Sequence, residues 1–146
     1  MSFRESLPNI FAAFLNGCVD CALWSSSIGE DFAQWWQDNK GDDMPVPDTS
    51  MQSFGFTADN LTAQAMRSLV NDCEQFCEHE AADLDTYTNT RDWSEAGHDF
   101  WLSRNGHGAG FWDRGLGKLG ARLNQAAKAC GTCDLYVGDD ERIHVH

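Results

Sequence analysis

The sequence predicts an α+β fold: three to four helices packed on a small antiparallel sheet made of two β-hairpins. Apolar residues recur at helical spacing in several segments, and short strand-like runs flank turn residues in two others. Helices come first along the chain and hairpins later, an order typical of α+β proteins. With 146 residues, 42% of them hydrophobic, the chain is long enough to bury one core, so residues 1–146 are expected to form a single domain.

Two helices are expected in the first forty residues. Residues 7–24 carry one apolar stripe at steps of three and four, and Pro8 suits the first turn. A second helix is expected over residues 28–37, with the serines at 25–27 as its cap. Residues 38–53 contain two prolines, a glycine and four aspartates, which predicts the longest loop.

The most extended helical pattern covers residues 58–85, where apolar side chains keep helical spacing and acidic ones occupy the other side. Thr57 is expected to cap this helix, with Asn60 at the capping-box position. Residues 116–129 predict a further amphipathic helix, and Gly131 is expected to end it.

Residues 96–115, AGHDFWLSRNGHGAGFWDRG, hold two of the five histidines, two of the six tryptophans and five of the thirteen glycines. Residues 99–103 resemble a strand, Asn105-Gly106 is a turn signal, and residues 110–112 would form the returning strand. The second hairpin is expected within residues 135–145, with its turn at Gly-Asp-Asp.

The formal net charge of −13 is unevenly distributed. An acidic helical part, about 1–90, carries fifteen acidic and three basic side chains, and the hairpin-helix-hairpin part, about 91–146, carries eight and seven. Such charge disfavours nucleic acid and anionic membranes, and indicates a protein partner with a basic surface. Ordered carboxylates could mimic the phosphates of DNA, while plain solubility is the alternative. The residues expected to bind are Asp42, Asp43, Asp72, Glu74, Glu78, Glu80, Asp83, Arg104 and Asn105.

A candidate catalytic cluster lies in the predicted central hairpin: His98, Asp99, His107 and Asp113. A His–Asp pair can perform acid–base chemistry, and two histidines with an aspartate can ligate a divalent metal. The alternative is structural, with polar residues serving the turn and aromatic ones filling the core. No recognised nucleophile motif is nearby, and the glycines lack the Lys-Ser/Thr ending of a phosphate loop, so a non-enzymatic protein is favoured.

The six cysteines form three close pairs, Cys18/Cys21, Cys73/Cys77 and Cys130/Cys133. The two C-x-x-C pairs are 108 residues apart, far from the spacing of a zinc ribbon or finger. Structural thiols and no cofactor are therefore expected, with zinc and redox function as alternatives. No run of eighteen apolar residues occurs, and the N-terminus lacks the features of a secretory signal, so a cytoplasmic location is expected.

The pattern AGHDFWL-[ST]-RN-x-HGAGFWDRG at residues 96–115, with DLYVGDD at 134–140 and ALWSS at 22–26, resembles a family of small acidic proteins of unknown function carried by tailed bacteriophages and prophages. The resemblance implies a phage or mobile-element origin and a bacterial host cytoplasm, and it implies no activity. We expect a phage-encoded accessory protein that binds and modulates or inhibits a host protein, such as a defence or nucleic-acid enzyme. A small metal-assisted or acid–base enzyme, or a structural or oligomeric accessory protein, is the alternative.

Overall fold

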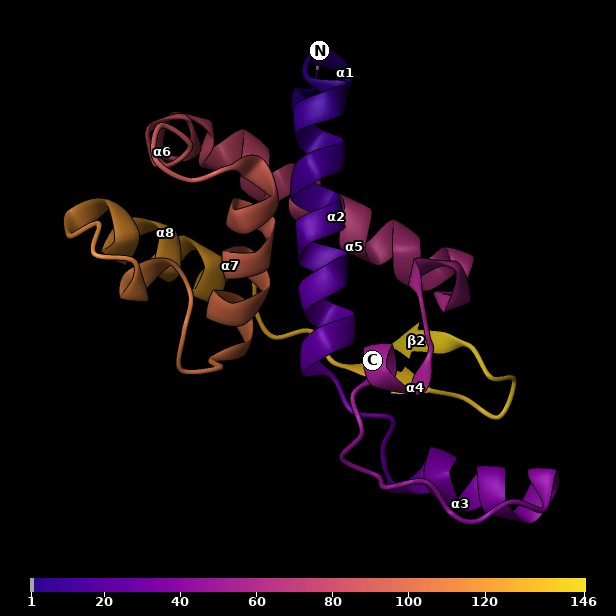
Figure 1. The fold of residues 1–146 in the computed structure, drawn as a ribbon. Coiled ribbons are helices and arrows are strands. Elements are labelled where there is room, and N and C mark those ends of the chain that lie inside the picture. The colour runs from indigo at the N-terminus through magenta and orange to yellow at the C-terminus, as the bar shows by residue number, and fades with distance from the viewer. Residues whose placement is uncertain (1) are drawn as a thin grey trace. The chain divides into compact units, whose positions relative to one another are not determined.

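Helices form most of residues 2–146, the part of the chain that the computed structural model describes (Figure 1). Within those residues, eight α-helices and two 3-10 helices precede one pair of strands. In order these are α1 (Phe3–Ser6), α2 (Pro8–Ser25), α3 (Glu30–Lys40), α4 (Met51–Phe54), η1 (Ala58–Asn60), α5 (Ala63–His79), α6 (Ala81–Tyr87), α7 (Trp93–Asn105), η2 (Phe111–Asp113), α8 (Lys118–Ala129), β1 (Leu135–Val137) and β2 (Ile143–Val145).

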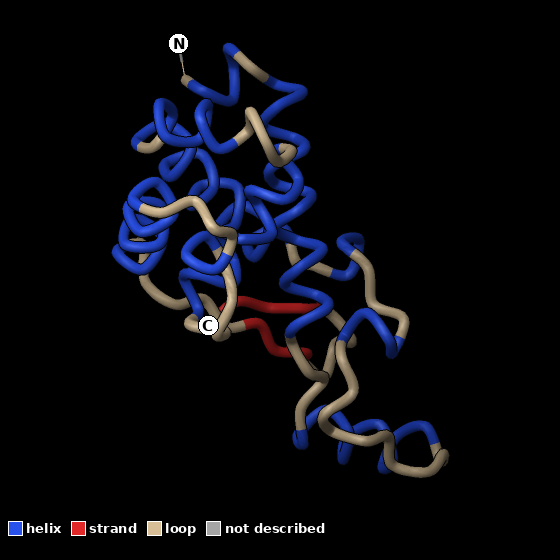
Figure 2. The backbone as a smooth tube through the Cα atoms, turned by 60° about the vertical axis from the view of Figure 1, so that its left-hand side comes forward, coloured by secondary structure: helices blue, strands red, loops and turns tan. Residues whose placement is uncertain are grey.

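The predicted α+β fold class is wrong, because the described residues are mainly helical and contain one hairpin instead of two. Figure 2 shows this hairpin, the pair β1 and β2, as the only red segment of the traced chain. The strands are antiparallel, with Leu135 opposite Val145 and Val137 opposite Ile143. The terminal hairpin is therefore confirmed, and the central one is absent from residues 2–146.

The first predicted strand of the central hairpin, residues 99–103, lies in helix α7 instead, and the predicted returning strand, residues 110–112, overlaps the 3-10 helix η2. Asp92 accepts a hydrogen bond from the Glu95 amide, and the Glu95 side chain accepts one from the Asp92 amide, which makes a capping box. At the other end Gly106 has a φ of 67°, so Asn105-Gly106 terminates a helix instead of turning a hairpin. Residues 99–104 are all buried, and a helix buried on every side has no apolar stripe that would reveal it in the sequence.

Several other boundaries follow from local geometry. Helix α2 begins at Pro8 as predicted, and the Thr57–Asn60 capping box is confirmed, although it starts the 3-10 helix η1. The single helix predicted over residues 58–85 is wrong, because η1, α5 and α6 divide that range and the chain breaks helical geometry at Glu80. Gly29, with no side-chain cap, precedes α3, so the serine cap is also wrong.

The residues predicted as the longest loop are only partly irregular. Helix α3 continues to Lys40, and Ser50 caps the short helix α4 within that range. Helix α8 confirms the amphipathic segment predicted near residues 116–129, and Gly131 follows it with a φ of 83°.

The chain divides into two compact units. Unit 1 consists of residues 1–21 and 68–133, and unit 2 of residues 22–67 and 134–146. Each unit therefore takes residues from both sides of position 90. The single-domain organisation stays a prediction.

The core of unit 1 is an aromatic cluster from α2, α5, α7 and η2. The Phe76 ring stacks on that of Phe100 with centroids 4.4 Å apart, and Phe14 lies 5.7 Å from Phe100. Two glycines bring α2 and α7 together, because a Cβ on Gly97 would overlap the Phe14 carbonyl oxygen and one on Gly17 would overlap that of Ser94. Close helix packing therefore fixes α7 beside α2.

The core of unit 2 centres on α3 and the segment that includes α4. Phe32 packs edge-on against Phe54 and Phe56 at 5.6 and 5.7 Å. The Lys40 ammonium lies 5.4 Å from the ring centre of Trp36, which it can stabilise by a cation–π contact. Among residues 2–146, every helix falls short of the length and hydropathy needed to cross a bilayer.

Candidate functional site

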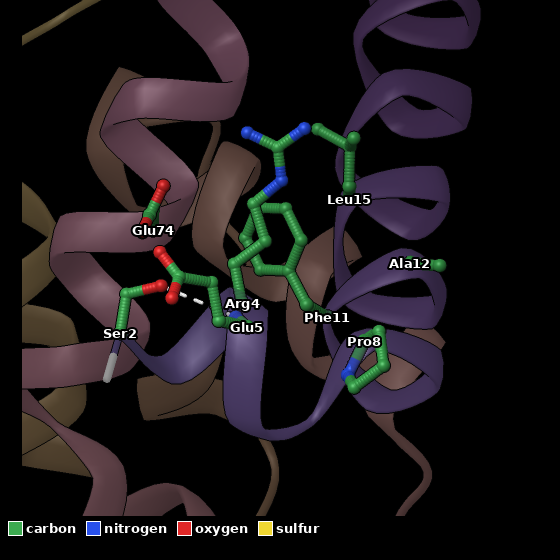
Figure 3. A pocket seen from close by; sticks show the side chains of 8 residues that line it. All are labelled: Ser2, Arg4, Glu5, Pro8, Phe11, Ala12, Leu15 and Glu74. Atoms are coloured by element: carbon green, nitrogen blue, oxygen red, sulfur yellow. Dashed lines mark hydrogen bonds between the residues drawn. The ribbon is translucent and has the colours of Figure 1, made fainter.

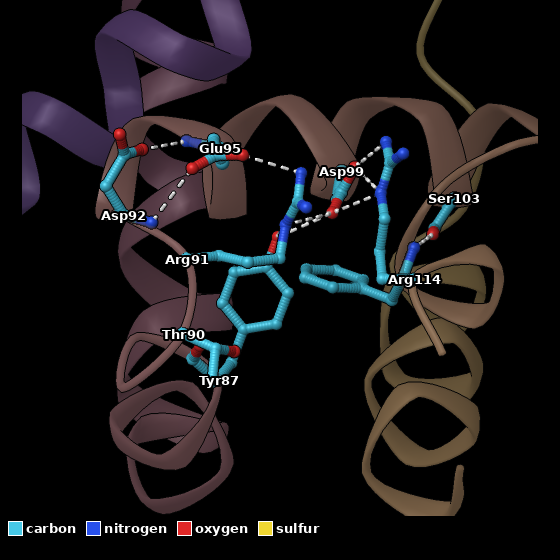
Figure 4. Close-up of polar contacts among 9 residues, drawn as sticks. Tyr87, Thr90, Arg91, Asp92, Glu95, Asp99, Ser103 and Arg114 are labelled. Atoms are coloured by element: carbon cyan, nitrogen blue, oxygen red, sulfur yellow. Dashed lines mark hydrogen bonds and ion pairs between the residues drawn. The ribbon is translucent and has the colours of Figure 1, made fainter. Parts of the chain in front are cut away.

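The most densely bonded polar group in unit 1 surrounds the fully buried carboxylate of Asp99 on α7 (Figure 4). The Tyr87 hydroxyl donates to Asp99 Oδ2 at 2.5 Å. Arg114 donates from Nη2 to Oδ1 at 2.5 Å and from Nε to both oxygens at 3.1 Å. Arg91 Nε donates to the Tyr87 hydroxyl at 2.9 Å, and its Nη2 lies 2.7 Å from Glu95 Oε2.

The electrostatics of this cluster favour the protonated forms of Tyr87 and Arg114. Burial and the hydrogen bond to Asp99 raise the pKa of Tyr87, so the hydroxyl remains a donor at neutral pH. Hydrogen bonds to Asp99 raise the pKa of Arg114 as well. A buried carboxylate needs such partners, because an unpaired buried charge is strongly destabilising.

These contacts connect three segments of unit 1 through the Asp99 cluster. Asp99 belongs to α7, Tyr87 to the end of α6, and Arg114 follows η2. Both Asp99 oxygens are occupied, and the side chain has no exposed surface for a substrate to reach. The arrangement therefore supplies structural cohesion.

The structure distributes the four predicted catalytic residues among different environments. His98 is half-buried on α7, where burial lowers its pKa while the neighbouring Asp99 opposes that shift. His107 is exposed just after α7 and Asp113 is exposed at the end of η2, while Asp99 is buried. His98 and Asp99 are neighbours on α7, but Asp99 is buried while His107 and Asp113 are exposed, so the four residues do not form one acid–base set.

Arg104, predicted as a binding residue, is a second buried charge. It is 5% exposed, and its Nε donates to the Gly131 carbonyl at 2.8 Å while Nη1 donates to Asp72 Oδ2 at 3.0 Å. Its guanidinium also lies 5.3 Å from the Phe100 ring centre. A cation beside the carbonyls that follow α8 complements the negative end of that helix. Arg104 and Asp72 therefore bond within the unit.

Other predicted binding residues in unit 1 also have internal partners. The Asn105 side chain accepts from the Cys133 amide at 2.8 Å. Asp83 receives two hydrogen bonds of 2.9 Å from Arg122, and these lower the pKa of Asp83. Glu78 accepts from the Phe3 amide at 2.9 Å. Glu80 is half-exposed.

The remaining predicted binding residue of unit 1, Glu74, lines a pocket of about 560 Å³ at the N-terminal end of α2 (Figure 3). Arg4, Glu5 and Phe11 also border it, and the Arg4 guanidinium lies 5.8 Å from the Phe11 ring centre. Two carboxylates and one guanidinium give the lining a formal charge of −1.

Unit 2 presents a different electrostatic surface. It contains eleven acidic and three basic side chains, a formal net charge of −8, against twelve and seven in unit 1. Ten of its eleven acidic residues are exposed, including the predicted Asp42 and Asp43. The ten are Glu30, Asp31, Asp38, Asp42, Asp43, Asp48, Asp59, Asp134, Asp139 and Asp140.

Few of these carboxylates have a positive partner. Within residues 2–146, the ion pairs of unit 2 are Lys40 with Glu141 at 3.2 Å and His144 with Asp140 at 3.0 Å. The loop of residues 41–50 also exposes the apolar side chains Met44, 44% exposed, and Val46, 65% exposed. Unit 2 therefore combines unneutralised carboxylates with exposed apolar surface.

Unit 2 also has a pocket of about 690 Å³ between the start of α3 and the end of β1. Its lining includes Phe32, Tyr136 and Val137, with Glu30 and Asp31 supplying carboxylates. The Tyr136 ring stacks on His144 and lies 4.3 Å from the His146 ring. The pocket thus has aromatic and acidic walls.

No disulfide joins the six cysteines, and only Cys130 is exposed. A hydrogen bond with Cys18 and burial raise the pKa of Cys73, and burial raises that of Cys77. These groups remain protonated and pack as small apolar side chains. In the part of the chain that the structure describes, no three His, Cys, Asp or Glu side chains are grouped as metal ligands would be.

A scan against protein-family models, a search of curated proteins and a search of solved structures each found no match to this chain. The site must therefore be judged from its own geometry. The sequence reasoning missed the roles of Tyr87 and Arg91 beside Asp99. The four-residue spacing of residues 87, 91, 95 and 99 could not have revealed them, because α6 ends at Tyr87 and α7 begins at Trp93, so no single helix carries that spacing.

Proposed function

We propose that this chain is an accessory protein of a bacteriophage or prophage that binds a host protein with a basic surface and modulates or inhibits it. The observation that carries the proposal is the exposed surface of unit 2, with ten exposed carboxylates and three basic side chains. The phage origin rests on the resemblance of residues 96–115 and 134–140 to the phage protein family.

Exposed carboxylates without counter-ions favour this function physically. Like charges in one unit repel one another and lower its stability, and a basic partner relieves that repulsion on binding. Long-range attraction also speeds association with an oppositely charged surface. A host enzyme that binds DNA presents such a surface, and the carboxylates of unit 2 would then occupy the place of the phosphates.

Exposed apolar side chains supply the short-range part of the contact. Met44 and Val46 project from the loop that also carries Asp42, Asp43 and Asp48. Interfaces commonly bury an apolar centre inside a polar rim. The loop is held by main-chain hydrogen bonds at its base, such as that from the Ile28 amide to the Thr49 carbonyl at 2.9 Å.

The acid–base alternative finds no support in the geometry, because Asp99 is buried and ion-paired while His107 and Asp113 are exposed. The proposed function therefore uses the surface of unit 2, and the Asp99 cluster has a structural role within unit 1.

The experiment compares three proteins immobilised for capture from nuclease-treated bacterial lysate. They are the wild type, a unit 2 variant (Asp42→Asn, Asp43→Asn, Asp48→Asn) and a unit 1 variant of equal net charge (Glu5→Gln, Asp20→Asn, Asp85→Asn). We expect the wild type and the unit 1 variant to retain the same basic protein. The unit 2 variant should release the captured protein at a lower salt concentration. Duplex DNA should compete with the wild type for binding to the captured protein.

The proposal fails if the captured protein resists a rise from 50 to about 300 mM salt, because a contact between charged surfaces weakens as salt screens it. Equal loss by the two variants would also contradict it, since the contact would then follow net charge and not the surface of unit 2.

A further inference from the structure

The β-hairpin of unit 2 has an open edge on β1. The His146 amide donates to the Asp134 carbonyl at 3.1 Å, and the Gly138 amide donates to the Arg142 carbonyl at 2.9 Å. Antiparallel pairing alternates, so Tyr136 bonds with His144, and the amides and carbonyls of the intervening residues point away from β2.

The two intervening residues are Leu135 and Val137. Within residues 2–146 their outward main-chain groups have no hydrogen-bond partner. The far side of β2 differs, because Ile143 forms a parallel bridge with Leu61 and its carbonyl accepts from the Thr62 amide at 3.0 Å. Leu135 is half-buried and Val137 is 7% exposed, so the β1 edge is reached at Leu135 and through the adjoining pocket that Val137 lines. A strand edge with unpaired main-chain groups is a template for pairing.

The pocket of about 690 Å³ adjoins this edge, since Tyr136 and Val137 line it together with residues 28–32. Glu30 and Asp31 are exposed in that lining, and neither has an ion-pair partner within the described residues. Tyr136, 40% exposed, offers an aromatic face beside them. Carboxylates and an aromatic ring together suit a guanidinium or ammonium group.

We propose that the β1 edge binds an extended, basic segment of the partner protein as a third strand, with an Arg or Lys side chain of that segment seated in the adjoining pocket against Glu30 and Asp31. This inference rests on the proposed function, which supplies a basic partner, and it names the segment and the residues that receive it.

Strand addition would use both the unpaired edge of β1 and the pocket beside it. Main-chain hydrogen bonds to Leu135 and Val137 give affinity without regard to sequence, and the pocket selects the side chain. Side chains alternate along a strand, so every second residue of the bound segment faces the same side of the hairpin. The segment should therefore carry a basic residue at alternate positions.

The test uses the full chain and two synthetic ten-residue peptides of alternating Arg and Val, one unmodified and one N-methylated at every residue, so that donors are removed from both edges of the bound strand. We expect the unmodified peptide to bind and to slow hydrogen exchange of the Leu135 and Val137 amides. N-methylation keeps the charge and removes strand-pairing donors, so it should weaken binding by about tenfold. Equal affinity for both peptides, no binding of either, or unchanged exchange at both amides overturns the inference.

A pair of charge-matched variants tests the pocket. Glu30→Gln with Asp31→Asn should weaken peptide binding about fivefold, as expected for two partly exposed ion pairs. Asp20→Asn with Asp85→Asn removes the same charge from exposed positions of unit 1 and should leave the affinity within about twofold. Circular dichroism verifies that both variants keep their helices.

The outcomes separate this inference from the proposed function. Salt-sensitive capture of a host protein together with failure of strand pairing, or with equal effects of the two double variants, leaves the proposed function standing and overturns the inference. Salt-insensitive capture removes the proposed function, whatever the peptides do.

Discussion

The Asp99→Asn replacement tests whether the buried ion pair holds unit 1 together. Asparagine keeps the shape of the side chain and removes the charge that faces Arg114, whose nearest nitrogen lies 2.5 Å away. Removing one partner of a fully buried pair costs about 3–5 kcal/mol. Arg114 and Arg91 keep 24% and 28% of their side-chain surface exposed, so the lower end, about 3 kcal/mol, applies.

Urea unfolding at pH 7, followed by circular dichroism, measures this change in the free energy of unfolding. A loss of about 3 kcal/mol corresponds to a fall in melting temperature of about 6–12 °C for a chain of this size. The matched control is Asp83→Asn, whose partner Arg122 is 57% exposed. Breaking that surface pair should cost less than about 1 kcal/mol.

The reasoning is refuted if Asp99→Asn loses no more stability than Asp83→Asn. A second check uses the double replacement of Asp99→Asn with Arg114→Gln. It should cost less than the sum of the two single replacements, because the unpaired cation disappears together with its partner.

Three further predictions concern packing, pH and thiol reactivity. Gly97→Ala should lower the free energy of unfolding by about 3 kcal/mol, because the added Cβ would overlap the Phe14 carbonyl oxygen. Urea unfolding measures this change. A loss below about 1 kcal/mol would contradict the close packing of α2 and α7. Because burial lowers the pKa of His98, the unfolded state binds the proton more readily, so stability should fall as pH drops below about 6.5. Denaturation at pH 7.5 and 5.5 should show a smaller fall for His98→Gln, and an equal fall would refute this assignment. Of the six thiols, Cys130 alone should react quickly with Ellman's reagent in the folded protein. Its reaction should be faster at higher pH, because partial burial raises the pKa of the Cys130 thiol. Rapid reaction of more than one thiol would contradict the buried placement of the others.

The sequence predicts helices well where one side packs and the other meets water. Pro8 begins α2 as expected, and the amphipathic pattern near residues 116–129 is confirmed by α8. Helix α7 escapes the same reasoning because residues 99–104 are buried without interruption. Its capping box at Asp92 and Glu95 was the available signal, and the Asn105-Gly106 dipeptide ends a helix as readily as it turns a hairpin.

The candidate site was harder to predict than the helices, because the role of each charged residue depends on which other charged residue it pairs with. Asp99 and Arg104 were both singled out from the sequence, yet their partners Arg114 and Asp72 lie 15 and 32 residues away. No local pattern specifies such long-range pairs. The unpaired edge of β1 could not be predicted from the sequence either, because it follows from the register of the hairpin and not from composition.

Pairing also decides which acidic residues remain available to a partner. Among the described residues, Asp72 is the only carboxylate hydrogen-bonded to Arg104, whose side chain is 3% exposed. The negative charge of Asp72 is therefore already compensated by Arg104. Asp43 is exposed and has no ion-pair partner within residues 2–146. Asp72→Asn should therefore lower the free energy of unfolding by about 1.5–3 kcal/mol, the range for hydrogen bonds to charged groups. Asp43→Asn should change it by less than about 0.5 kcal/mol, because it only relieves repulsion at the surface.

Binding should respond in the opposite order. Asp43→Asn removes a charge that a basic partner can reach, whereas Asp72→Asn removes one that Arg104 already compensates. Urea unfolding and salt-dependent capture of the host protein, measured on both variants, give the two rankings. If Asp72→Asn weakened capture more than Asp43→Asn while the protein stayed folded, the contact surface would lie on unit 1 and the assignment to unit 2 would be wrong.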